Sequence, residues 1–310
     1  MSPGFVNSYI QSLAPRIEQL TNEFLDDMGD SFDLIKTIAK PLPALVIPEM
    51  LGVPLQDRRF FQAWSDDLAG ATILGRPDLL RKASDAETAM RSYLTGLIET
   101  KKDEKDEKDE KDFISLLIHA HEAGDRLTHD ELIGTCVLLL SAGHETTTRL
   151  IGNGLYALLT HPEQMALLRN DTTLLESAIE EMLRFEPPFQ MTIRFVKEKM
   201  ALNGARFSKG QKVLVCFAGA NRDPRAFPDP DRFDITRSDN KHISFGYGFH
   251  MCLGMALTRL EAKIVFRQLL DRYQDISCLE ETRHGASIHF FGICNSYGLL
   301  SLKNIRQDRI

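Results

Sequence analysis

Apolar residues recur along most of this chain at the spacing of one helix face. From Phe5 to about Met28 they stand three or four residues apart, and comparable runs follow as far as about Phe185. Positions at this spacing lie on one side of an α-helix, so the pattern predicts a series of amphipathic helices. We expect them at residues 5–28, around 32–35, before Gly52, at 57–69, 77–99, 113–120, 128–160, from Pro162, at 174–185 and at 255–273.

The longest predicted helix is apolar on every side before it becomes polar. Thr128 with Glu131 three residues later has the pattern of a capping box, and the helix should run to about Thr160. Cys136–Leu140 has no polar residue, which places this helix in the core. Glycine and successive threonines then follow within Ser141–Thr147, and both lower helix propensity. A functional segment is one interpretation; a kinked core helix with back-bonded hydroxyls is the other.

Short strand-like runs replace the helical pattern beyond Pro188, with glycine-containing turns between them. We expect strands at 191–196, 200–202 and 211–217, turns at 203–204 and 209–210, and a β-rich tail from about Cys278. The whole pattern predicts one mainly α domain with a minor β component over residues 1–310.

The composition is that of an ordinary globular protein. Of 310 residues, 43% are apolar and 26% charged, and a formal charge of −7 without a basic stripe gives no support to nucleic-acid binding. Five widely spaced cysteines, an odd number, indicate a reducing compartment. No signal-peptide pattern and no apolar run long enough to span a bilayer is present, so we expect a cytoplasmic protein with no membrane partner.

A charged repeat interrupts the helical pattern at Lys101–Asp112. On a helix, attractive pairs four residues apart would be offset by like charges three apart, each worth roughly 0.2–0.5 kcal/mol. The segment therefore has little drive toward a structure of its own. We interpret it as a charged low-complexity insertion, a solvated helix extension or a mobile loop, in preference to a docking element.

The strongest chemical signal lies near the C-terminus, at Phe245–Gly254. Cys252 stands between closely spaced glycines, and a helix-compatible run, Met255–Ala262, follows at once. Unpaired N–H groups and the positive end of a helix favour an anion, so we expect Cys252 to form a thiolate readily and to present it to a metal. No second Cys or His stands at finger spacing, which argues against structural zinc. The alternative is a buried structural cysteine.

This stretch resembles the haem-binding signature of the cytochrome P450 family, Phe-x-x-Gly-x-(His or Arg)-x-Cys-x-Gly. Phe245, Gly248, His250, Cys252 and Gly254 fill every fixed place of that signature. The resemblance implies that Cys252 is the axial ligand of a haem iron and that His250 binds a haem propionate.

A second motif of the same family lies in the long core helix. Ala142, Gly143, Glu145, Thr146 and Thr147 match its oxygen-binding pattern, (Ala or Gly)-Gly-x-(Asp or Glu)-Thr-(Thr or Ser). A small residue leaves room for a diatomic ligand, and an alcohol beside a carboxylate offers a hydrogen-bond donor with a proton supply behind it. The resemblance implies that Thr146 is the alcohol on the oxygen side and that Glu145 passes protons inward.

Further positions also match the family. Glu181 and Arg184 fit its Glu-x-x-Arg helix, where the pair is structural and braces an irregular segment, the meander, below the haem. Arg194 stands where the family has an arginine that binds a propionate, a task that the guanidinium fork suits, although it could also be an ordinary strand arginine. His242, which precedes the signature, is interpreted equally well as a packing or capping residue.

The resemblance implies a cytochrome P450 fold and a haem-thiolate monooxygenase. The cofactor would be haem b, with dioxygen as co-substrate and electrons drawn from NAD(P)H through a ferredoxin or flavodoxin partner. One oxygen atom would enter a small organic substrate, which the sequence does not identify. The candidate pocket residues are Phe189, Gln190, Met191 and the segment Ile288–Ile293.

The resemblance also implies an N-terminally truncated chain. Soluble members of the family usually have a first β-sheet, several helices and a substrate-capping loop before the point where this chain begins. The alternative function is therefore a truncated, catalytically inactive remnant or a haem-binding protein. A peroxide-using or rearranging member is a third possibility, which the retained Glu145–Thr146 pair disfavours.

Overall fold

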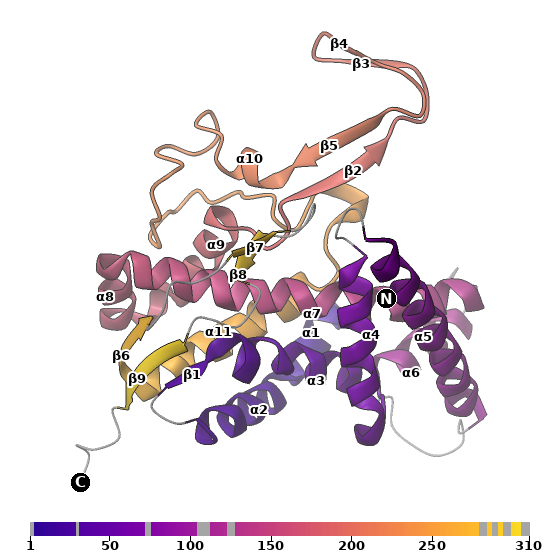
Figure 1. Cartoon of the computed structure of the whole chain (residues 1–310), viewed down its shortest axis with the longest axis horizontal. Coiled ribbons are helices and arrows are strands. Elements are labelled where there is room, and N and C mark those ends of the chain that lie inside the picture. Colours follow the sequence, from indigo (N-terminus) through magenta and orange to yellow (C-terminus); the bar gives the residue numbers. More distant parts are fainter. Residues whose placement is uncertain are drawn as a thin grey trace.

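The structure is a computed structural model of the chain, and it describes residues 3–28, 31–71, 76–103, 112–122, 128–278, 284–286, 291–293 and 299–304. Helices make up most of this part of the chain (Figure 1), which confirms the predicted fold class. None of the described helices is both long and apolar enough to cross a membrane. The α-helices are α1 (Pro3–Ser12), α2 (Ala14–Asp26), α3 (Pro41–Met50), α4 (Arg58–Gly70), α5 (Pro77–Asp103), α6 (Phe113–Glu122), α7 (His129–Thr160), α8 (Pro162–Asn170), α9 (Leu175–Phe185), α10 (Phe217–Asn221) and α11 (Met255–Arg272).

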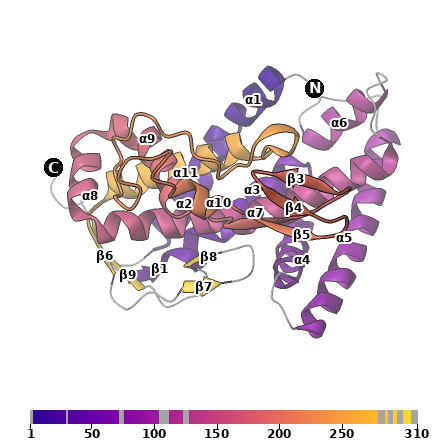
Figure 2. The ribbon, with the colours of Figure 1, turned by 90° about the horizontal axis from the view of Figure 1, so that it is seen from above.

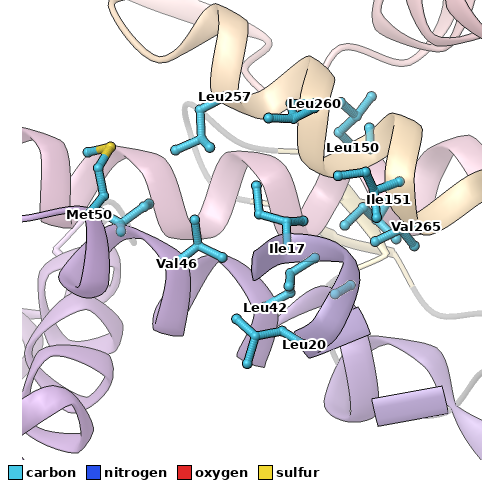
Figure 3. Packing of buried hydrophobic residues seen from close by; sticks show 14 of the residues in the cluster. Ile17, Leu20, Leu42, Val46, Met50, Leu150, Ile151, Leu257, Leu260 and Val265 are labelled. Atoms are coloured by element: carbon cyan, nitrogen blue, oxygen red, sulfur yellow. The ribbon is translucent and has the colours of Figure 1, made fainter. Parts of the chain in front are cut away.

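Helix α7 crosses the body of the molecule, with α11 and α3 packed along it (Figures 1 and 2). Its N-terminus has the predicted capping box: the Thr128 hydroxyl accepts from Glu131 N at 3.3 Å, and Thr128 N donates to the Glu131 carboxylate at 2.7 Å. Four helices, α2, α3, α7 and α11, share the apolar core (Figure 3), which includes Ile17, Leu20, Leu42, Val46, Met50, Leu150, Ile151, Leu257, Leu260 and Val265.

The predicted strands beyond Pro188 form one long hairpin of two successive paired sections, which extends away from the helical body (Figure 1). β2 (Met191–Phe195) pairs with β5 (Lys212–Cys216), and β3 (Met200–Leu202) pairs with β4 (Ala205–Phe207). The turn between β3 and β4 has positive φ at both Asn203 (48°) and Gly204 (81°), the geometry that a tight hairpin requires. The strands and turns expected here are confirmed.

The sheet that contains β6 and β9 lies away from the hairpin, whereas β7 and β8 lie beside α7 (Figure 1). β6 (Tyr273–Cys278) and β1 (Ser31–Asp33) flank β9 (Leu299–Asn304) in a three-stranded antiparallel sheet, and β7 (His284–Ala286) pairs with β8 (Phe291–Ile293). Part of the segment Ile288–Ile293 lies outside the described residues, so its expected role in the pocket stays a prediction.

Two of the expected helices are wrong. The single helix expected at residues 5–28 is two helices that meet at Leu13, because Pro15 lacks an N–H and cannot continue the hydrogen bonding of α1. The segment around 32–35 begins as strand β1, which is followed by the π-helical turn Ile35–Ala39. Its pairing with β9, far along the chain, overrides the local pattern.

The charged repeat is only partly described. Lys101 and Lys102 lie in the last turn of α5, and Lys101 Nζ lies 2.6 Å from Asp112 Oδ2 just before α6. Residues 104–111 lie outside the described residues, so the insertion stays a prediction.

Two glycines of α7, Gly154 and Gly134, allow the packing around this helix to be tested. A Cβ on Gly154 would lie 2.6 Å from Met182 Sδ in α9 and 2.9 Å from Phe266 Cζ in α11, whereas one on Gly134 would meet nothing within 4 Å. We expect Gly154→Ala to lower the free energy of unfolding by about 1–3 kcal/mol because the core is overpacked. The matched change Gly134→Ala should raise it by about 0.5–1 kcal/mol. Urea unfolding measures both, and effects of the same sign would contradict the packing.

Candidate haem-binding active site

The loop that carries Cys252 is shaped by its own backbone. Gly246 and Gly248 have φ of 74° and 73°, a region that side-chain-bearing residues rarely adopt. Cys252 N donates to Phe245 O at 2.9 Å, and Gly246 N donates to Ile243 O at 2.8 Å. These bonds close the loop and hold Cys252 just before α11.

The environment of the Cys252 sulfur corrects one expectation. The N–H groups of Gly254 and Met255 and the charge of Arg259 do lower its pKa, as a helix N-terminus should. Burial raises the pKa by more, so the thiol of Cys252 has a pKa above its ordinary value. The prediction that the helix end alone makes this thiol ionise readily is wrong. A coordinated metal ion deprotonates a thiol directly, so ligation does not need a lowered pKa beforehand.

A buried ion pair anchors the segment that leads to this loop. Glu181 and Arg184, both 0% exposed, make two parallel hydrogen bonds of 2.8 Å. Arg184 also donates to the backbone oxygens of Asn221, Pro230 and Arg232 at 2.8–3.1 Å. These contacts link α9 to the segment between α10 and Arg232, and the structural role expected for the pair stays a prediction.

The carboxylate of Glu181 also accepts hydrogen bonds from three donors other than Arg184. It accepts from Asp234 N at 2.9 Å, from Asn240 Nδ2 at 3.1 Å and from Arg237 Nε at 3.3 Å. Because all of these donors lie in the irregular segment after α10, the pair fixes the path of the chain toward the Cys252 loop.

Asn221 and Ser244 complete this connection. Asn221 Nδ2 donates to Ser244 Oγ at 2.8 Å, its Oδ1 accepts from Ile243 N at 2.9 Å, and Ser244 Oγ donates to Leu183 O at 2.7 Å. The sequence did not indicate either residue, because the partners are more than twenty positions apart.

A second carboxylate of α9 holds the other side of the loop. Glu180 accepts two hydrogen bonds from Arg259, of 2.6 and 2.7 Å, and lies 3.1 Å from His242 Nε2. Burial raises the pKa of Glu180, but its bonds with Arg259 and His242 and their charges lower it overall to about 2. The guanidinium of Arg259 lies 4.5 Å from the centre of the Phe245 ring. His242 is therefore a packing and hydrogen-bonding residue, and Glu180 and Arg259 were missed.

The polar segment of α7 forms its own hydrogen bonds. Thr146 Oγ1 donates to Ala142 O at 3.0 Å, the back-bonded arrangement considered above as the structural alternative. Glu145 lies 2.6 Å from Arg149 Nη2, an arginine one turn along that sequence reasoning did not single out. The structure therefore holds Glu145 in an ion pair on its own helix.

Gly143 has a packing role. A Cβ at this position would lie 2.4 Å from Ile47 Cδ1, so its small size allows α3 to approach α7. His144 lies between Gly143 and Glu145 in the chain. Its Nε2 lies 3.1 Å from Lys40 O, and burial lowers the pKa of His144.

The two motifs meet at one small cavity of about 50 Å³. It is lined by Gly143 and Thr147 of α7 and by Gly254, Thr258 and Glu261 at and after the N-terminus of α11, among others. Thr147 Oγ1 lies 3.3 Å from Thr258 Oγ1. The structure thus places side by side two segments about a hundred residues apart.

The propionate candidates are solvent-exposed. Arg194 Nη1 donates only within β2, to Thr192 Oγ1 at 3.0 Å and to Ile193 O at 3.1 Å, and no carboxylate among the described residues pairs with it. His250 ends the short 3₁₀ turn Gly248–His250. Both keep polar groups available to a ligand.

The family model of cytochrome P450 matches residues 72–285. The chain belongs to the cytochrome P450 family. It is 43% identical over 279 residues to cytochrome P450 monooxygenase PikC of Streptomyces venezuelae, covering 88% of this chain and 65% of that protein. It is 38% identical over 280 residues to 6-deoxyerythronolide B hydroxylase of Saccharopolyspora erythraea, covering 89% of this chain and 67% of that protein.

Solved cytochrome P450 structures have the same fold. Ligand-free TbtJ1 is 37% identical, with a TM-score of 0.88 over 96% of this chain and 78% of that one. P450BioI in complex with an acyl carrier protein ligated to hexadec-9Z-enoic acid is 36% identical, with a TM-score of 0.87 over 95% and 75%. The chain spans about two thirds of the length of the curated relatives it matches.

The residues around Cys252 fit the haem that this cytochrome P450 family uses. The loop exposes Tyr247, Phe249, Met251 and Leu253, and a flat apolar macrocycle would cover such surface. Cys252 would supply the soft sulfur ligand. Among the described residues, no cluster of three or more His, Cys, Asp or Glu offers another metal site.

The buried pair can be tested by a conservative change. Arg184→Lys keeps the charge but removes the fork, so Glu181 and three backbone oxygens lose donors in a buried place. We expect a loss of about 3–5 kcal/mol in the free energy of unfolding. The control Arg225→Lys, in the exposed pair with Asp223, should have no measurable effect in the same denaturant titration. Equal stability of the two variants would refute the brace.

Proposed function

We propose that the chain is the haem-thiolate catalytic portion of a cytochrome P450 monooxygenase that oxidises or hydroxylates a small organic substrate. The observation that carries this proposal is that Gly143 and Thr147 of the α7 motif and Gly254 of the Cys252 motif line one cavity between α7 and α11. The names of the relatives as monooxygenase and hydroxylase support it.

Each residue has a defined task in this proposal. Cys252 is the axial ligand of haem b, and Arg194 and His250 bind its propionates. With the thiolate ligand in place, the haem supplies the activation of dioxygen and the transfer of one oxygen atom. Thr146 breaks its bond with Ala142 O to donate a hydrogen bond on the oxygen side. Glu145 leaves its ion pair with Arg149, accepts a proton from solvent on a carboxylate oxygen and passes that proton inward.

The electron source and substrate class complete the proposal. Electrons come from NAD(P)H through a ferredoxin- or flavodoxin-type protein. A relative is named 6-deoxyerythronolide B hydroxylase, and a structural neighbour carries a fatty acid on an acyl carrier protein. These names favour a largely apolar substrate, with Phe189, Gln190 and Met191 as proposed contacts.

A second candidate is a haem-binding protein without turnover. Cys252 lines an open cavity of about 970 Å³ with residues of α1, α9 and α11, so this side of the site is open although neighbouring atoms partly desolvate the sulfur. Haem uptake without product, when a reductase system and apolar substrates are supplied, would select this candidate.

The ligand assignment is tested by the spectrum of the reduced, carbon monoxide-bound protein purified with haem. We expect a thiolate-type band in the wild type and in Cys278→Ala, a change at an exposed cysteine of β6. The band should be absent in Cys252→Ala, which lacks the sulfur ligand. A band retained by Cys252→Ala, or no haem uptake by the wild-type chain, would contradict the proposal.

The role of Thr146 is tested by product formed per electron consumed. Thr146→Ala should bind haem normally but lose on the order of 10²-fold in product formation, because a positioned proton donor contributes that much. Thr135 makes the same type of back-bond on α7, at 2.7 Å to Glu131 O, so Thr135→Ala is the matched control and should be unchanged. Parallel losses in both variants would indicate a purely structural hydroxyl.

A further inference from the structure

An aromatic cluster lies between α4 and α5, outside the segments that were given a task above. It contains Phe60, Phe61 and Trp64 of α4, together with Tyr93 of α5. Trp64 is the only tryptophan of the sequence, and its ring centre lies 6.2 Å from that of Tyr93. The ring centre of Phe61 lies 5.1 Å from both. Packing accounts for these contacts, but not for the partner of the one hydroxyl in the cluster.

The hydroxyl of Tyr93 has a base as its partner. It donates to Asp57 Oδ2 at 2.5 Å, a short hydrogen bond of the charge-assisted type. Within the part of the chain that the structure describes, no other donor bonds to this carboxylate. Burial raises the pKa of Tyr93, and the hydrogen bond and charge of Asp57 raise it further. The phenol therefore keeps its proton at neutral pH and directs it at an oxygen that can bind it.

This arrangement favours the loss of one electron by Tyr93. Oxidation of a phenol turns its hydroxyl into a strong acid, so the electron leaves most readily where a base takes up the proton at the same time. A positioned base typically accelerates a step that includes proton transfer by about 10²–10⁴-fold. Tyr93 and Trp64 are also partly buried against the core, which slows the reaction of a radical with other molecules.

We propose that Trp64, Tyr93 and Asp57 form a redox-active site that holds a radical on Tyr93. A one-electron oxidant removes an electron from the indole of Trp64, and Tyr93 gives an electron back to that ring. The O–H bond of Tyr93 breaks in this step, and its proton binds Asp57 Oδ2. The products are a neutral phenoxyl radical, a carboxylic acid and the restored indole. A one-electron reductant of the thiol or ascorbate class, with the proton from Asp57, reverses the change.

Trp64 is the point at which the site meets its oxidant. It is half-buried, and its ring stacks at 6.1 Å on that of Phe60, which is 42% exposed. A small oxidant in solution can therefore approach the indole more closely than it can approach the phenol behind it. The radical site consists of protein groups and needs no haem. Its use in the loaded enzyme, as a sink for an oxidation that ends without product, rests on the proposed function.

Flash photolysis of the haem-free full chain tests the radical. Tris(bipyridyl)ruthenium(III), produced by the flash, is the oxidant, and the absorption and EPR signals of the indole and phenoxyl radicals are the readout. Because Tyr247 is 90% exposed and would react directly, every protein in the comparison carries Tyr247→Phe. We expect an indole radical that decays as a phenoxyl radical appears. Tyr93→Phe should abolish this phenoxyl phase.

Tyr9→Phe is the matched control. The hydroxyl of Tyr9 donates to Met50 O at 3.0 Å, and a backbone carbonyl is too weak a base to keep the proton. The phenoxyl phase should therefore be unchanged in Tyr9→Phe and should appear more slowly, without the indole signal, in Trp64→Phe. A phase that survives in Tyr93→Phe or disappears in Tyr9→Phe would overturn the site, and an unchanged rate in Trp64→Phe would remove Trp64 from it.

The proton acceptor has its own test. Asp57→Asn keeps an oxygen that accepts the hydrogen bond but removes the base, so the phase should slow on the order of 10²-fold. Its rate should then increase with the concentration of buffer base, whereas the rate with Asp57 present should not, because the acceptor is internal. A merely structural hydrogen bond would change stability and leave the buffer dependence alone. Should Asp57→Asn fail to fold, a buffer-dependent rate with Asp57 present would by itself overturn the assignment.

The use as a sink is measured in the haem-loaded enzyme supplied with reductant and dioxygen but no substrate. Tyr93→Phe should lose its haem absorbance faster than the wild type, and Tyr9→Phe should not. If the flash results are as expected but haem is lost at equal rates, the radical site stands and its use as a sink is refuted. If the chain takes up no haem, the flash results still decide the radical site.

Discussion

The buried pair of Glu181 and Arg184 is the interaction on which the arrangement of this site depends. A buried ion pair is weak evidence for stability, because desolvation of two charges offsets their attraction. Here the pair bonds four backbone groups, one at the end of α10 and three in the irregular segment that follows, and two side chains of that segment. An irregular segment needs such partners for its polar backbone. The pair therefore determines where that segment runs, and the loop of Cys252 begins where it ends.

Two adjacent residues of α9, Glu180 and Glu181, support the two sides of the Cys252 loop. Glu181 faces the irregular segment before the loop, and Glu180 faces Arg259 on the helix after it. Successive residues on a helix point about 100° apart, so one short helix reaches both sides of the loop. Arg259 then connects this support to the Phe245 ring and to the electrostatic environment of Cys252. The position of the thiol is consequently set by residues that never contact it directly.

The sequence predicted most helices and the site motifs, because both are encoded by local spacing. Helix α7 and its capping box could be predicted because they depend only on residues close together in the sequence. The break between α1 and α2 at Pro15 is also a local feature and should have been predicted. The pairing of β1 with β9 was out of reach, because its partner lies at the other end of the chain. The partners Arg149, Glu180, Asn221 and Arg259 were missed for a related reason: each is an ordinary polar residue until folding brings its acceptor near. The predicted direction of the Cys252 pKa shift was wrong, because a helix N-terminus recognised in the sequence does not reveal how far the sulfur is buried.

The hydrogen bond from Cys252 N to Phe245 O has a consequence for ligand affinity. It closes a ring of eight residues whose ends would otherwise have to be brought together when a ligand binds. The entropy lost in closing such a loop, which grows with the logarithm of its length, is spent during folding. Gly246 and Gly248 make that closed shape accessible without backbone strain. A group that binds the sulfur therefore meets a preorganised ring, and more of its contact energy remains as affinity.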